Sequence, residues 1–210
     1  MMRGLAVMVL VAACGGPRER PSRASRTGEE ACTRPRVALE PPPAGAPARS
    51  VDLDVSARHG RERIRFEGRR LEIRDSTGEL LLAADGGMET DAEPLPSVLR
   101  WTRSALERAD LLLLWNAKAH PEGSPEGCLV DEQKVVVYRD LQPGSAPAME
   151  EVVRRRRGCG RPGFRVRVGL CEDGDVVRLQ KRTKGGGRVD RIRRYDDVSN
   201  TFGRAMRASP

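Results

Sequence analysis

The first half of the chain alternates apolar and polar residues in three short segments, a pattern typical of strands with one buried face, and a short apolar run follows them. Residues 51–55 (Val-Asp-Leu-Asp-Val) show it most strictly. Gly68 and the run at 75–78 (Asp-Ser-Thr-Gly) are turn signals between segments. The predicted strands are residues 51–55, 63–66, 71–74 and 80–83. Their close spacing predicts a short antiparallel meander.

The spacing of apolar residues changes after residue 94. They then recur three or four residues apart, which predicts an amphipathic helix over residues 95–109. The apolar positions of this helix are Leu95, Val98, Leu99, Thr102, Ala105, Leu106 and Ala109. Pro94 and Pro96 mark its start, and Ser97 is a candidate cap. Residues 111–115 either extend the helix or form a buried strand, because consecutive leucines fit both.

The second half combines strands with another helix. Three consecutive valines in residues 134–138 are typical of a strand buried on both faces. A second helix is predicted over residues 145–157, because Ser145 can cap it and its apolar face then holds Met149, Val152 and Val153. The next predicted elements are a strand at 164–170 and its hairpin partner at 176–179.

These elements predict an α+β fold with a small mixed sheet and two helices, in a single domain spanning residues 51–206. Residues 14–50 precede this domain as a Pro/Arg-rich linker. Seven of the 15 prolines fall between residues 15 and 50. A segment of this composition cannot bury a core, so it is expected to be a disordered tether.

The N-terminus resembles the signal of a bacterial lipoprotein. Residues 5–13 form an apolar run after Arg3 that is short for a membrane span, which needs roughly 20 apolar residues. Residues 11–14 (Val-Ala-Ala-Cys) resemble a lipobox. The resemblance implies removal of residues 1–13 as a signal peptide and lipidation of Cys14. The alternatives are an ordinary signal peptide or a wrongly assigned start, each with an accidental cysteine.

This resemblance also implies a location in the cell envelope. Triacylation of Cys14 would hold the protein firmly, whereas a single acyl chain binds a membrane only marginally. Gly15 follows the cysteine, where lipoproteins retained in the inner membrane have Asp. The expected location is therefore the bacterial envelope, at the outer membrane rather than the inner one.

The formal net charge of +8 bears on possible partners. Only two Trp, two Tyr and three Phe are present, and single-stranded nucleic acid binding normally uses aromatic stacking. With the expected export, this scarcity excludes nucleic acid as a partner. The positive charge suits membrane headgroups or an anionic cell-wall polymer, although it also fits a merely solvated surface.

The basic residues are concentrated in the second half of the chain. Between residues 154 and 194 there are 15 Arg or Lys against four Asp or Glu. The candidate surface for an anionic ligand consists of Arg154, Arg155, Arg156, Arg157, Arg165 and Arg167. Because only four of the 38 basic residues are lysines, a GC-rich genome is an alternative explanation of this enrichment.

Residues 134–170 resemble the periplasmic domain of the biopolymer-transport ExbD/TolR family. The matching positions are a strand ending in Asp140, a helix carrying Met149 and Val152, and Gly163 before a strand. The resemblance implies a module that works with a transport complex driven by the proton-motive force. That family has an N-terminal transmembrane helix with a proton-path carboxylate where this chain has a lipobox. Only a role in binding the cell wall or an envelope protein therefore carries over.

Four cysteines remain after Cys14, which predicts two disulfides in an exported protein, with three possible pairings. Cys159 and Cys171 flank the predicted strand at 164–170, so they would lie roughly 23 Å apart, beyond disulfide reach. The strands at 134–138 and 164–170, joined by a helix, are expected to be parallel. Cys128 and Cys159 precede these strands at one sheet edge, which predicts a Cys128–Cys159 bond and leaves Cys32–Cys171.

No catalytic or metal-binding pattern stands out. Cys128, Cys159, Cys171 and His120 lack the close cysteine spacing of zinc sites. His59 and His120 both lie in polar segments typical of solvated loops. No nucleophile or metalloprotease motif occurs. The sequence therefore predicts neither an enzyme nor a cofactor, but a membrane-anchored lipoprotein with a binding or accessory role in the envelope.

Overall fold

The four strands predicted in the first half form an antiparallel sheet in the order β2-β3-β4-β5. Its strands are β2 (Arg49–Ser56), β3 (Gly60–Glu67), β4 (Arg70–Arg74) and β5 (Leu80–Asp85). On β3, Ile64 and Phe66 are fully buried while Arg63 and Arg65 are exposed. The predicted meander is therefore confirmed, with one apolar and one polar face.

The computed structural model of the chain describes residues 32–56, 60–85, 96–103, 108–119, 122–123, 125–139, 141–182 and 187–207. Residues 31–210 form one compact unit. Cys14, His59, His120 and Asp140 lie outside the described residues. Within the described ranges, no helix is long and apolar enough to cross a membrane.

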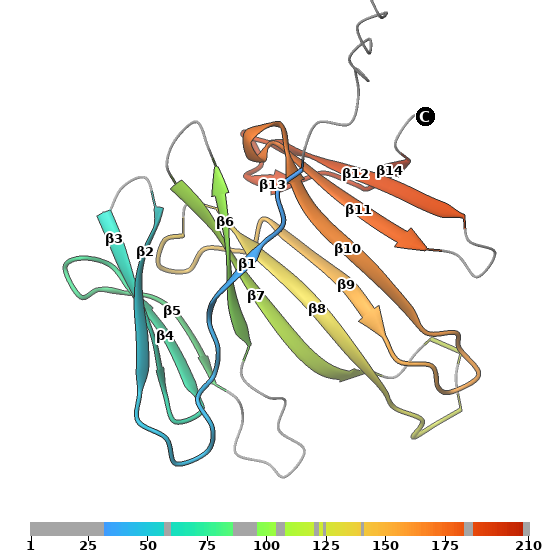
Figure 1. Ribbon diagram of the computed structural model, residues 1–210, viewed down its shortest axis with the longest axis horizontal. Coiled ribbons are helices and arrows are strands. Elements are labelled where there is room, and N and C mark those ends of the chain that lie inside the picture. The colour runs from blue at the N-terminus through green and yellow to red at the C-terminus, as the bar shows by residue number, and fades with distance from the viewer. Residues whose placement is uncertain are drawn as a thin grey trace, which may run out of the picture. The chain divides into compact units, whose positions relative to one another are not determined.

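A second, larger sheet contains ten antiparallel strands (Figure 1). Nine of them follow the order β1-β6-β7-β8-β9-β10-β11-β12-β13, and β14 pairs with β12. The strands are β1 (Arg36–Leu39), β6 (Ser97–Arg103), β7 (Arg108–Ala119), β8 (Val130–Tyr138), β9 (Met149–Arg155), β10 (Phe164–Cys171), β11 (Val176–Arg182), β12 (Arg188–Asp196), β13 (Thr201–Phe202) and β14 (Met206–Arg207).

The predicted α+β fold is wrong, because the regular structure of the described chain is almost entirely β. The helix expected over residues 95–109 is replaced by β6 and the start of β7, as far as that segment is described. The helix expected over residues 145–157 is replaced by β9. The helical structure in the described ranges is the short 3-10 helix η2 (Glu172–Gly174).

The central strands β6, β7 and β8 are buried on both faces, which explains the first misleading pattern. One core lies between the two sheets, and from these strands it takes Val98, Leu111, Leu113 and Val136. The other core lies on the opposite face and takes Leu99, Trp101, Leu112, Val135 and Val137. Strands with two buried faces lose the apolar–polar alternation. Apolar residues three or four positions apart then fit a helix by coincidence.

A β-bulge in β9 produced the second misleading pattern. Arg154 pairs with Gln133 and Val152 with Lys134, which leaves Val153 as an extra residue on β9. Met149 and Val153 are four residues apart, so they lie on the same face as in a regular strand and belong to the second core. At the bulge the neighbouring Val152 is half-buried as well, so the apolar residues at 149, 152 and 153 take on helical spacing.

The N-terminal residues of the described unit connect β6, near one end of the larger sheet, with β10 in its interior. β1 pairs with β6, and just before it Thr33 forms an antiparallel bridge to Leu170 at the end of β10. Figure 1 shows β10 leaving β9 and running toward the start of β1. Residues 32–50, expected to belong to a disordered tether, therefore contribute β1, the start of β2 and this bridge.

Candidate functional site

A cavity of about 700 Å³ lies where β10 separates from β9. Its apolar lining comes from five strands and consists of Leu99, Leu114, Val135, Val153, Val166 and Val168. Its cationic lining consists of Arg34, Arg165, Arg167, Lys181, Arg182 and Arg188. Pro35, Gln133 and Gln180 complete the lining, which includes no carboxylate among the described residues. The cavity thus combines an apolar lining with a strongly positive one, within the size range of ligand pockets.

Strand register aligns four arginines across β9, β10, β11 and β12. Arg154 lies opposite Arg165, and Arg182 lies opposite Arg188. Val166 lies opposite Lys181, so the preceding residue Arg165 stands beside Arg182 in the same antiparallel register. We call Arg154, Arg165, Arg182 and Arg188 the arginine row. Like charges directly opposite one another destabilise a sheet, so this arrangement has an energetic cost.

Most cations of the cavity lack a compensating carboxylate. Within the described chain, Arg34, Arg165, Arg167 and Arg182 form no ion pair. Arg188 is different, because its Nε atom lies 3.1 Å from an Asp190 carboxylate oxygen. The guanidinium groups that remain are available to an anion that enters from solvent.

Only some of the six arginines predicted to form an anionic-ligand surface lie at the cavity. Arg165 and Arg167 line the cavity, and Arg154 joins them through the arginine row. Arg155 pairs with the buried Glu132, and Arg156 pairs with the exposed Asp131 at 3.2 Å.

The remaining predicted arginine, Arg157, lines a separate hollow of about 450 Å³. Sequence reasoning missed Arg34, Lys181, Arg182 and Arg188, whose proximity depends on the path of the N-terminal segment and on strand register.

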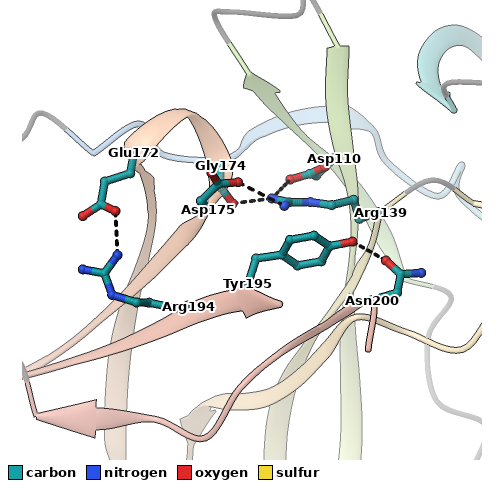
Figure 2. Close-up of polar contacts among 8 residues, drawn as sticks. All are labelled: Asp110, Arg139, Glu172, Gly174, Asp175, Arg194, Tyr195 and Asn200. Carbon is teal, nitrogen blue, oxygen red and sulfur yellow. Dashed lines mark hydrogen bonds and ion pairs between the residues drawn. The ribbon is translucent and has the colours of Figure 1, made fainter. Parts of the chain in front are cut away.

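A buried cation lies outside this cavity, at the end of β8. The Arg139 side chain is 3% exposed, and its Nη2 atom lies 3.2 Å from a carboxylate oxygen of the fully buried Asp110 (Figure 2). The same guanidinium donates to the Gly174 carbonyl and stacks on Tyr195, with 3.8 Å between Cζ and the ring centroid. These contacts hold β7, β8 and β12 together with η2, which indicates a structural role.

Three ionisable groups outside the cavity have shifted pKa values. Burial raises the pKa of Tyr138, and the nearby Glu150 carboxylate adds to the effect. A hydrogen bond from Arg63 lowers the pKa of Asp52. Hydrogen bonds from Ser199 and the Val198 N–H lower the pKa of Asp196. None of these groups lines the cavity, so these shifts do not indicate acid–base chemistry there.

Both disulfides join the cysteines paired in the sequence analysis. Cys128 bonds to Cys159 with a Cα–Cα distance of 5.7 Å, and Cys32 bonds to Cys171 with 4.3 Å. The second bond lies beside the bridge between Thr33 and Leu170, so it fixes Arg34 at the edge of the cavity. The confirmed pairing supports an oxidising compartment.

The residues brought together in the cavity suit binding better than catalysis. Its described lining contains no Ser, Thr, Cys, His, Asp or Glu, so it holds no carboxylate base, and Lys181 is the one residue in it of a type that serves as a nucleophile. Among the described residues, no group of three His, Cys, Asp or Glu side chains is arranged to hold a metal ion. What the lining offers is guanidinium donors beside apolar surface.

Comparisons with known proteins identify no relative, so the interpretation of the cavity rests on its geometry. No family model matches the chain, and no curated protein or solved structure is significantly similar to it.

Proposed function

We propose that this chain is a lipid-anchored, non-catalytic binding protein of the bacterial envelope, and that its β10 cavity receives an anionic ligand. The observation that carries the proposal is the arginine row, three of whose members line a cavity without a carboxylate. The repulsion between these arginines falls when an anion lies among them. The apolar lining adds surface that a ligand can bury.

The lipid anchor and the compartment have their own support. Residues 11–14 fit a lipobox, and two disulfides are typical of a protein outside the reducing cytoplasm. Labelled palmitate should be incorporated by the full chain in a bacterial host. The Cys14→Ser variant should incorporate none, and equal labelling of both proteins would contradict the anchor.

The binding test uses purified peptidoglycan and polyglutamate as anionic probes. The full mature chain should bind at least one of them, and Arg165→Glu with Arg167→Glu should weaken that binding at least about tenfold. The basis is that hydrogen bonds to charged groups are each worth about 1.5–3 kcal/mol. Co-sedimentation serves for peptidoglycan and fluorescence anisotropy for polyglutamate.

Arg63→Glu with Arg65→Glu is the matched control on β3. Both pairs are exposed arginines two residues apart, and both changes alter the net charge equally. The control variant should bind like the unaltered chain. Equal weakening by the two variants would show nonspecific attraction, and absence of binding by the unaltered chain would reject an anionic ligand.

A further inference from the structure

One stretch of β10 inside the cavity is paired with a strand on one side only. β11 pairs with residues 166–171 along one edge of β10. Along the other edge, pairing with β9 ends at Arg165, and the bridge to Thr33 begins at Leu170. Residues 166–169 therefore form a gap in the pairing of the described chain, which we call the β10 gap.

Backbone groups in the β10 gap are directed toward the cavity. Leu170 and Thr33 exchange two hydrogen bonds of 2.8 Å, so Leu170 directs its N–H and C=O to this edge. Alternate residues of a strand share that direction, so Val168 presents its N–H and C=O to the same edge. Within the described chain these two groups of Val168 have no hydrogen-bond partner. An open edge of this kind is a template for another strand.

The side chains beside the gap determine which strand would fit. Val166 and Val168 are half-buried against the second core, whereas Arg165 and Arg167 are exposed on the opposite face. A strand added to this edge places successive side chains on alternate faces. One set of its side chains would lie beside the valines and the other beside the arginines.

We propose that the β10 gap binds an extended segment of a partner protein in which acidic and apolar residues alternate. This inference rests on the proposed anionic-ligand site and specifies its ligand. Four residues of such a segment span about 13 Å and fill the gap between β9 and Thr33. An anionic lipid would satisfy the arginines and the apolar lining but would leave the Val168 backbone without a partner, so a peptide fits better.

Two octapeptides of identical composition test this inference. One alternates Glu and Val, and the other has all its Glu residues before its Val residues. Fluorescence anisotropy with the full mature chain should show at least about tenfold tighter binding of the alternating peptide. Equal affinities would overturn strand addition while leaving the anionic-ligand proposal in place, because charge alone would then explain binding.

N-methylation of the alternating peptide tests its backbone directly. Methyl groups on every second amide nitrogen remove either the donors that face β10 or those that face away. The peptide whose β10-facing donors are methylated should bind at least about tenfold more weakly, and the other should keep its affinity. Since the protein is unchanged, misfolding cannot explain the loss, and equal effects of the two patterns would overturn the inference.

Further controls separate this inference from the broader proposal. If phosphatidylglycerol vesicles bind the protein and displace the alternating peptide, the ligand is a lipid, and the proposed strand addition is overturned. If the protein binds peptidoglycan or polyglutamate but neither octapeptide, strand addition is also overturned, whereas the proposed anionic-ligand site stands. Failure of every anionic probe would reject both proposals.

Discussion

At the residue scale, Arg139 is the side chain with the greatest expected effect on stability. Arg139→Met would leave the buried Asp110 carboxylate without its guanidinium, at an expected cost of about 3–5 kcal/mol in the free energy of unfolding. Urea denaturation measures this cost. Replacing both partners, with Arg139→Met and Asp110→Leu, should recover much of the loss, because the double variant leaves no unpaired charge at this position.

The matched control for this change is Arg156→Met, which removes an arginine whose side chain is 77% exposed in its pair with Asp131. It should leave the free energy of unfolding nearly unchanged, since exposed pairs contribute little. If the two single variants unfold at similar urea concentrations, the Arg139 cluster does not stabilise the fold as argued.

At the scale of elements, the sequence predicted strands well where one face is solvated or where a β-branched run marks a buried strand, as in β8, and poorly in the other strands with two buried faces. The β2–β5 meander and the strands at 134–138, 164–170 and 176–179 follow from their patterns. β6 and β9 do not, because two-sided burial and the bulge at Val153 produced helical spacing. The site was foreseen only in part, since a local run of arginines cannot reveal cross-strand register.

Two-sided burial of β7 predicts the result of substituting neighbouring residues. Leu112 and Leu113 belong to different cores and are both essentially unexposed. Leu112→Ala and Leu113→Ala should therefore each lower the free energy of unfolding by about 2–5 kcal/mol. Thermal or urea denaturation of the two variants measures the effect.

A one-sided strand, β3, provides the comparison for this pair. Ile64→Ala should cost about as much as either leucine substitution, whereas Arg65→Ala should cost little, because only Ile64 is buried. A large loss for Leu112→Ala and a negligible loss for Leu113→Ala would show that β7 has one buried face, contrary to this fold.

At the scale of the whole molecule, the disulfides show why a correct pairing followed from an incorrect topology. The strands at 134–138 and 164–170 were expected to be parallel and joined by a helix, but the strand β9 joins them and lies between them. Two antiparallel steps reverse the direction twice, so β8 and β10 still run the same way. Cys128 and Cys159 therefore still meet before these strands.

The two bonds should contribute unequally to stability. Cys32–Cys171 closes a sequence separation of 139 and Cys128–Cys159 one of 31, which in the chain-entropy account correspond to about 5 and about 4 kcal/mol. Replacing Cys32 and Cys171 with Ser should therefore destabilise the protein more than replacing Cys128 and Cys159. Urea denaturation of the two double variants compares them, and the reverse order would contradict the closing role of the N-terminal segment.

The same two variants connect the fold to the binding site. Only the Cys32–Cys171 bond fixes Arg34 and the bridge beside the β10 gap. Under conditions where both variants remain folded, loss of that bond should weaken binding of the alternating peptide, whereas loss of Cys128–Cys159 should not. Equal affinities in both variants would mean that the cavity forms without the N-terminal segment, so that β10 and its arginines alone determine binding.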